Sequence, residues 1–143
     1  LVSIHSPCDE ASRKKILRWI KDLDDEITVG NLVKHVSLIP EYRKAQTKIE
    51  VRLGTAKNKA GRVAVSHAAY TNGGYDIAKC YLKHGIGTVS YIHISEADLT
   101  KLRGDGVGNL IILGHDSSDW LGVNSLLKEL EKNDVEAFRL SDF

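Results

Sequence analysis

The sequence has no methionine, only two cysteines, and no appreciable excess of either charge. Cys8 and Cys80 are too few for a disulfide-rich secreted scaffold and lack the spacing of a structural zinc site, so we expect reduced thiols. Twenty basic and nineteen acidic residues form no broad basic stripe, which argues against nucleic acid as a partner. No apolar run approaches the roughly 18 residues of a membrane span, and none resembles a signal peptide. We therefore predict a cytoplasmic protein without membrane contact.

The amino-acid composition is that of a globular domain. Of 143 residues, 42% are hydrophobic and 27% are charged, enough for one core. The sequence opens at Leu1 directly on the alternating pattern of a strand, with no methionine before it. We therefore expect either a single domain spanning 1–143 or the carboxyl-terminal portion of a longer protein.

Hydrophobic periodicity predicts strands and helices that alternate along most of the chain. The predicted strands are 1–5, 49–53, 62–66, 88–94, 109–113 and 135–140. The predicted helices are 12–23, one capped by Thr28 and ending near Pro40, 75–84, 96–103, and one whose buried face is Val123, Leu126, Leu127 and Leu130. We expect strands 49–53 and 62–66 to form an antiparallel pair, with 41–48 as a connector. Helices between the later strands predict parallel βαβ units, so the expected fold is α/β, with a mixed, largely parallel sheet and helices on both faces.

Two loops stand out because they follow predicted strands, where α/β proteins bind ligands. Residues 5–9 and 114–119 each supply a histidine and, four residues later, an aspartate: His5 with Asp9, and His115 with Asp119. Imidazole and carboxylate groups suit zinc, iron, manganese or cobalt. Together the two pairs could hold one or two ions.

Simpler roles are also open to these residues. Asp119 could be an acid in the first turn of a helix capped by Asp116 or Ser117, where the helix dipole favours negative charge, and Asp9 could itself be a cap. Cys8 could supply a thiolate or be inert. His93, near the end of strand 88–94, is a weaker candidate to lie against the ligands, whereas His35 and His84 have the positions of surface or capping residues.

Two glycine-rich segments differ in their order relative to strands and helices. Residues 104–108 run from helix to strand, which is the wrong order for a dinucleotide-binding loop, so we predict a turn. Residues 71–74 lie between a strand and a helix, where backbone N–H groups could bind phosphate. Asn72, Gly73 and Gly74 are therefore candidate phosphate-binding residues, with a plain tight turn as the alternative.

The segment 114–124 (GHDSSDWLGVN), followed by 127–132 (LKELEK), resembles the carboxyl-terminal motif of the Nif-three-like (Nif3-like) family of dinuclear-metal proteins. Residues 5–9 resemble the family's His-x-x-x-Asp motif, and 71–74 lie where the family has a glycine-rich loop. The resemblance implies that Asp9, His115 and Asp119 are metal ligands, with His5 among or against them. Many members have Glu where Asp119 stands, and the family's paired histidines lie upstream of the His-x-x-x-Asp motif.

The resemblance also implies a function. We expect a divalent metal ion, which could be zinc, iron or manganese, and a metal-dependent hydrolase acting on a nucleotide or a phosphorylated small molecule, either cyclohydrolase-like or phosphohydrolase-like. The alternative is a non-catalytic metal-binding or regulatory protein that acts through partners. A ring-like homo-oligomer is also implied.

Overall fold

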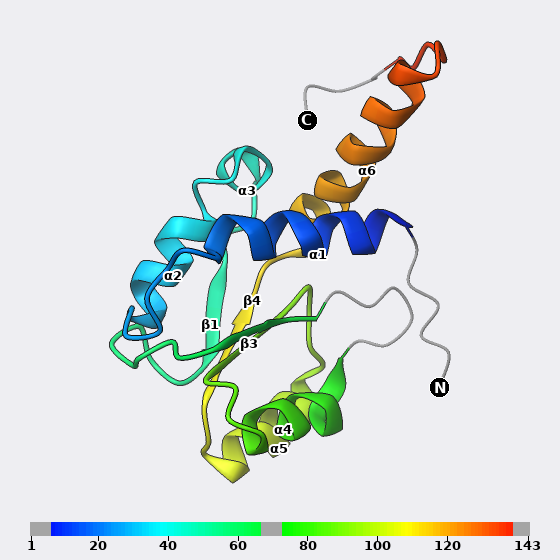
Figure 1. The fold of residues 1–143 in the computed structure, drawn as a ribbon. Coiled ribbons are helices and arrows are strands. Elements are labelled where there is room, and N and C mark those ends of the chain that lie inside the picture. Colours follow the sequence, from blue (N-terminus) through cyan, green and yellow to red (C-terminus); the bar gives the residue numbers. More distant parts are fainter. Residues whose placement is uncertain (1–6, 67–72, 139–143) are drawn as a thin grey trace.

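The computed structural model describes residues 7–66 and 73–138 (Figure 1). The described helices are α1 (Pro7–Ile20), α2 (Val29–Val36), α3 (Pro40–Lys44), α4 (Gly74–Lys83), α5 (Glu96–Asp105) and α6 (His115–Lys132). The described strands are β1 (Glu50–Leu53), β2 (Val63–Val65), β3 (Thr88–Tyr91) and β4 (Asn109–Ile112). The strand predicted at 1–5 lies outside the described residues.

The four strands form one mixed sheet in the order β1-β4-β3-β2. Strand β3 pairs in parallel with both β2 and β4, and β1 pairs antiparallel with β4. The prediction of a mixed, largely parallel sheet is therefore confirmed.

The predicted antiparallel pair of β1 and β2 is wrong, because these strands occupy opposite edges of the sheet. The segment between them does not turn back as a hairpin but bonds to the start of α2. The amide N–H of Val29 donates to the carbonyl oxygen of Asn58 over 2.8 Å. The amide N–H of Ala60 donates to the carbonyl oxygen of Ile27 over 2.7 Å. The central place next to β1 goes instead to β4, whose apolar residues suit burial on both faces.

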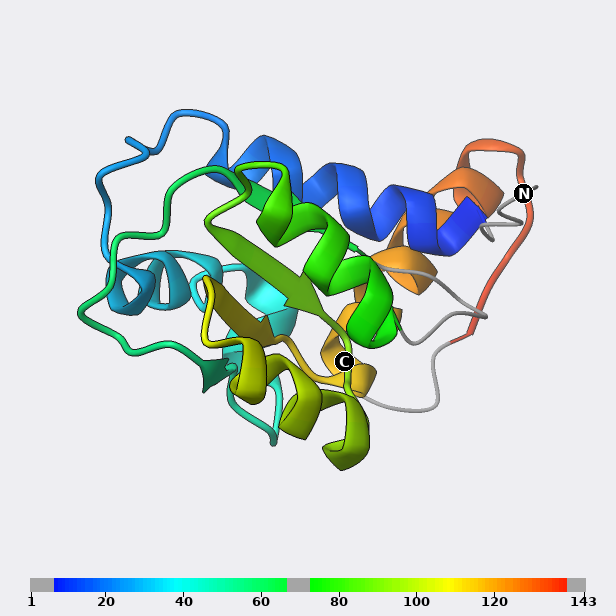
Figure 2. The same ribbon diagram turned by 90° about the horizontal axis from the view of Figure 1, so that it is seen from below.

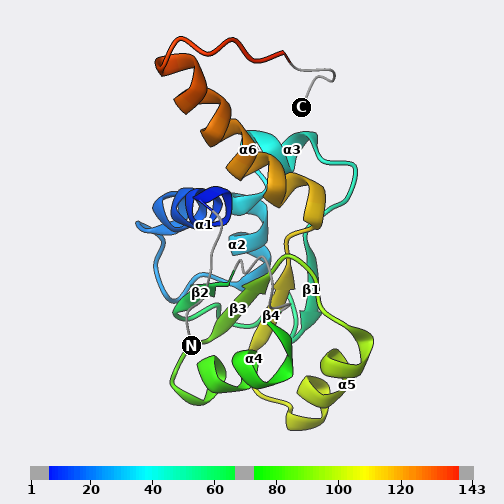
Figure 3. The same ribbon diagram turned by 90° about the vertical axis from the view of Figure 1, so that its right-hand side faces the viewer.

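Helices cover both faces of the sheet, as the sequence predicts. Helices α1, α2, α3 and α6 lie on one face and α4 and α5 on the other (Figures 2 and 3). Strand β4 contributes to both cores: Leu110 packs in the core with α4 and α5, whereas Ile111 packs in the core with α1 and α2, as does Leu113 just after the strand. None of the helices in the described ranges is both long and apolar enough to cross a membrane.

Several predicted boundaries change where loops were expected. Helix α1 begins at Pro7 instead of Ser12, and the proline at its start suits the first helical position. Residues 41–44 of the expected connector belong to α3, which begins at Pro40. Residues 135–138 contain no strand. The predicted Thr28 cap is confirmed, since its hydroxyl accepts the amide N–H of Asn31 over 3.3 Å. Ser95 caps α5 in the same way and accepts the amide N–H of Asp98 over 3.1 Å.

Helix α6 departs most from its predicted form. It begins at His115, so that residues 115–119 are helical instead of forming a loop. Its buried residues are Ser117, Ser118, Leu121 and Gly122. The predicted buried face is wrong: Val123, Leu127 and Leu130 are half-buried, and Leu126 is 48% exposed. The buried residues all lie between Ser117 and Gly122, while the carboxyl-terminal part of α6 extends away from the sheet (Figures 1 and 3).

Gly73 allows α4 to start directly beside β3. Its φ is +65°, a conformation that favours glycine, and a Cβ at this position would overlap the ring of Tyr91. The Tyr91 hydroxyl in turn donates to the carbonyl of Gly74 over 3.0 Å. Packing alone therefore requires glycine at position 73.

Glu41 of α3 joins three helices through a buried polar cluster. The Lys15 ammonium of α1 lies 2.6 Å from Glu41 Oε1, and the Asn124 amide of α6 donates to the same oxygen over 3.1 Å. Burial pushes the pKa of Glu41 upward, but the Lys15 and Asn124 contacts outweigh it and hold this pKa below its ordinary value of 4.5.

We expect Glu41→Gln to lower the free energy of unfolding by about 1–3 kcal/mol at pH 7. Because the folded-state pKa of Glu41 is lowered, its stabilisation is present above pH 4.5 and is lost as the pH falls through the folded-state pKa. Urea unfolding of both proteins between pH 7 and pH 3 measures the difference, which should shrink in acid. The exposed Glu129, paired with Lys132, offers a control in Glu129→Gln, which should change little. A difference that does not vary with pH would contradict the assignment.

We expect Gly73→Ala to destabilise the fold by about 2–5 kcal/mol, because the new methyl group meets Tyr91 and the backbone is left-handed. The matched control is Gly104→Ala, inside α5, where, apart from the adjoining helix backbone, no atom of the described residues lies within 4 Å of the new Cβ. That change should stabilise the protein by about 0.5–1 kcal/mol. Denaturant unfolding compares the two, and equal stabilities would show that Gly73 is not required by packing.

Candidate metal centre

The candidate site lies at the edge of the sheet where β3 and β4 end. These strands are parallel, with Tyr91 opposite Ile112, so the segments that follow them begin at the same edge of the sheet. His93 follows β3 and His115 follows β4. Their imidazole rings are in contact, with centroids 5.1 Å apart and planes nearly perpendicular at 88°. The structure therefore brings together two histidines that the sequence placed on separate loops.

Asp119 lies one helical turn after His115, on the same side of α6. Partial burial of its carboxyl group raises the pKa of Asp119 above its usual value. His115 opposes this rise, and repulsion from Asp9 and Asp116 adds to it. Asp9, in the first turn of α1, is thus within electrostatic reach of Asp119.

Neither simpler role matches the structure: Asp9 lies inside α1 and does not cap it, and Asp119 is not in the first turn of α6, which follows Gly114 and not Asp116 or Ser117. Asp9 lies in the first turn of α1, where the helix dipole favours a carboxylate. Asp119 lies beyond the first turn of α6, and the amino end of that helix has no side-chain cap. A first-turn role therefore does not account for Asp119.

The described side chains supply only part of a metal-binding site. Within 7–66 and 73–138, no three His, Cys, Asp or Glu residues form a group that could hold a metal ion. The described candidates His93, His115, Asp119 and Asp9 are linked by a ring contact and by electrostatic interaction. His5, the remaining predicted ligand, lies outside the described residues. Imidazoles and carboxylates are chemically suited to zinc, iron or manganese, so the residues fit a divalent ion in kind.

The glycine-rich segment contributes Gly73 and Gly74 at the start of α4, whereas Asn72 lies outside the described residues. The N-cap residue of this helix is Gly73, which has no side chain to accept a hydrogen bond from the first backbone N–H groups. An anion could bind at this end of α4, but the close approach of the Tyr91 ring is already sufficient to explain why position 73 is a glycine. Phosphate binding by Asn72, Gly73 and Gly74 therefore remains a prediction.

The two remaining histidines among the described residues, His35 and His84, lie apart from this edge. His35 Nε2 lies 3.0 Å from the Trp19 carbonyl oxygen, and the Trp19 indole N–H donates to the His35 carbonyl over 3.0 Å. His84 ends α4 and contacts Cys80, with Nδ1 to Sγ at 3.8 Å. Both have the surface and capping positions expected from the sequence.

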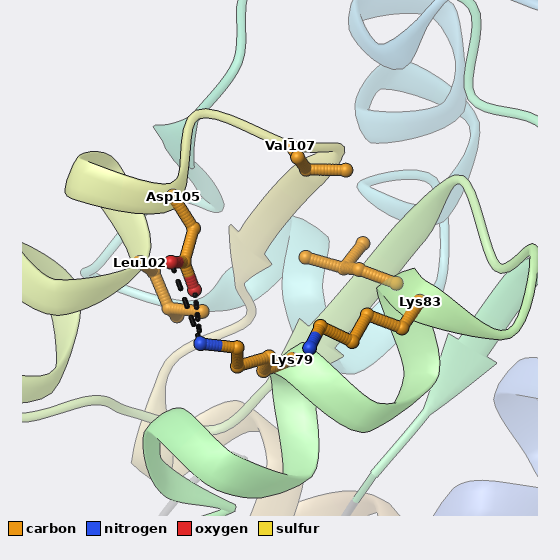
Figure 4. A pocket seen from close by; sticks show the side chains of 6 residues that line it. Lys79, Lys83, Leu102, Asp105 and Val107 are labelled. Atoms are coloured by element: carbon orange, nitrogen blue, oxygen red, sulfur yellow. Dashed lines mark hydrogen bonds and ion pairs between the residues drawn. The ribbon is translucent and has the colours of Figure 1, made fainter.

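A separate cavity of about 210 Å³ lies between α4 and α5 (Figure 4). It is lined by Lys79, Leu82, Lys83, Leu102, Asp105 and Val107. The Lys79 ammonium pairs with the Asp105 carboxylate over 3.2 Å. Val107 precedes β4 whereas His115 follows it, so this cavity is not part of the candidate metal centre.

Sequence reasoning missed the residues beneath the site. Tyr42 and Ser118 are buried and hydrogen-bonded over 3.0 Å, and Ser12 donates to the Ser118 carbonyl over 3.0 Å. Tyr42 lies in the segment predicted as a connector and Ser118 in the segment predicted as a loop, so neither was expected to be buried. The i, i+4 spacing of Ser118 from Gly114 was the only available signal.

Comparisons with known proteins place the fold in a family. No protein-family model and no curated protein matched the chain. The crystal structure of a NIF3 superfamily protein from Sphaerobacter thermophilus is 38% identical, with a TM-score of 0.80, over 95% of this chain and 50% of that one. This chain therefore spans about half the length of that relative.

More distant structures share the fold alone. The Staphylococcus aureus protein SA1388 is 16% identical, with a TM-score of 0.53, over 85% of this chain and 34% of its own. A Bacillus cereus protein related to NIF3 is 17% identical, with a TM-score of 0.55, over 85% and 33% respectively. With 38% identity to a NIF3 superfamily protein across nearly its full length, the chain belongs to the Nif3-like family.

Proposed function

We propose that this chain contributes His115, Asp119 and Asp9 to a divalent-metal site of a Nif3-like protein, with His5 as a further ligand and His93 against His115. The observation that carries the proposal is the ring contact between His93 and His115 at the shared carboxyl edge of β3 and β4. Ligand sites in parallel sheets form at such edges.

Electrostatics supports a cation at this place. Partial burial of Asp119 disfavours its charge most, His115 opposes this effect, and the carboxylates of Asp9 and Asp116 add to it. Like charges held near one another destabilise a fold unless a cation lies between them. A divalent ion would remove this repulsion and allow all three carboxylates to remain ionised.

The chemistry we propose is hydrolysis of a nucleotide or another phosphorylated small molecule. A divalent ion, when bound, lowers the pKa of coordinated water and polarises a phosphoryl group. His115 and Asp119 are exposed, so a substrate can reach them from solvent. The amino end of α4, with Gly73 and Gly74, would receive a phosphate through its backbone N–H groups.

A non-catalytic role is the second candidate. Among the residues that the structure describes, no three potential ligands are already grouped to hold an ion. An exposed site of this kind suits reversible metal binding that regulates contacts with partners. Further copies of the chain, as in the proposed homo-oligomer, would be such partners, and mass measurement in solution with and without zinc would detect them.

Calorimetric titration with zinc or manganese tests the ligand assignment. We expect His115→Ala and Asp119→Asn to weaken binding by about tenfold or more, since each removes a direct ligand. The matched control is His84→Ala, an exposed histidine at the end of α4, which should bind as the wild type does. Because His115 and Asp119 are exposed, thermal unfolding of the variants should stay cooperative with little loss of stability.

Two outcomes would contradict the proposal. Wild-type affinity in His115→Ala would show that this histidine is not a ligand. Loss of cooperative unfolding in the same variant would show that His115 serves the fold instead of a metal.

A further inference from the structure

The inner side of the first turns of α6 is held by buried hydroxyl groups from two other helices. Ser12 comes from α1 and Tyr42 from α3, and both meet Ser118 of α6. The exposed fractions of Ser12, Tyr42 and Ser118 are 1%, 6% and 2%. The outer side of the same turns carries the exposed His115 and Asp119.

The direction of these hydrogen bonds follows from counting protons. Ser118 Oγ lies 2.6 Å from the carbonyl oxygen of Gly114 and must use its one proton there. The Tyr42 hydroxyl, 3.0 Å away, is therefore the donor to Ser118 Oγ. Burial raises the pKa of Tyr42 well above its ordinary value, so the hydroxyl keeps the proton that it donates.

The two carbonyl groups that accept these bonds have a particular place in the chain. The Gly114 carbonyl belongs to the peptide group that continues into His115, and it accepts from Ser118. The Ser118 carbonyl belongs to the peptide group that continues into Asp119, and it accepts from Ser12 over 3.0 Å. The hydroxyl network thus restrains the backbone immediately before each of the two proposed ligands on α6.

We infer that Tyr42 is a positioning residue for the proposed metal site, acting through Ser118 to orient His115 and Asp119. This inference rests on the proposed function. Side chains that bind a metal must be held close to their productive geometry, and partners behind the ligands supply that restraint. Without the Tyr42 hydroxyl, Ser118 loses its only donor from α3 among the described residues, and the ligand-bearing turn is less restrained.

The test compares Tyr42→Phe, which removes one buried oxygen and keeps the ring, with Thr88→Val as the matched control. Thr88 is fully buried in β3, before the strand reaches the site, and donates to the Ala60 carbonyl over 2.7 Å. Both variants lose a buried hydroxyl that donates a hydrogen bond, so both should lower the unfolding temperature. Only Tyr42→Phe should act on the metal site.

We expect Tyr42→Phe to weaken Co²⁺ binding about three- to tenfold and to change the visible absorption bands of bound Co²⁺, which report ligand geometry. In metal-free protein, the NMR signals of the His115 imidazole should also shift. Thr88→Val should match wild type in affinity, absorption and the His115 signals. A merely structural role for Tyr42 would instead make the two variants alike.

The readouts separate the two claims. If wild type binds Co²⁺ and Tyr42→Phe gives the same affinity, spectrum and His115 signals, the positioning role is overturned while the metal site stands. If wild type binds no Co²⁺, the proposed function is overturned, and a shifted His115 signal in Tyr42→Phe would still support the orientation of this residue by Tyr42.

Discussion

The parallel pairing of β3 with β4 is the constraint on which the candidate site depends. Its register, from Thr88 opposite Asn109 to Tyr91 opposite Ile112, makes both strands end at one edge of the sheet. Strand β4 fills both cores through Leu110 and Ile111, so a slip of one residue would exchange their faces and expose apolar surface. The same packing that fixes the register therefore brings His93 and His115 together.

Helix α6 begins at this edge, and its two sides have different roles. Its inner side, through Ser118, is fastened to α1 and α3 by buried hydroxyl groups. Its outer side presents His115 and Asp119, and Asp119 is within electrostatic reach of the Asp9 carboxylate. The fold thus places rigid hydrogen bonds behind the candidate ligands and leaves mutually repelling carboxylates in front. A cation is the simplest group that would balance them.

The sequence patterns predicted the fold class and most elements, because apolar periodicity and caps such as Thr28 are local signals. They failed for β1 and β2, since strand pairing depends on which buried strand takes the centre of the sheet. They also read residues 115–119 as a loop, because a polar segment that begins a helix without a side-chain cap looks like a connection. The i, i+4 spacing of His115 and Asp119 was visible in the sequence, but the contact of His115 with His93 depends on the parallel pairing of two strands. Tyr42 could not be linked to the site, because its partner Ser118 is 76 residues away.

The central claim is that the carboxyl edge of β3 and β4 binds a divalent cation. Titration of isotope-labelled protein with Mn²⁺, a paramagnetic ion, measures this directly through broadening of nearby NMR signals. The account predicts that signals of Asp9, His93, His115 and Asp119 broaden first, at the lowest Mn²⁺ concentrations, while those of His84 remain sharp. Equal broadening across the surface, or broadening that begins at His84, would contradict it.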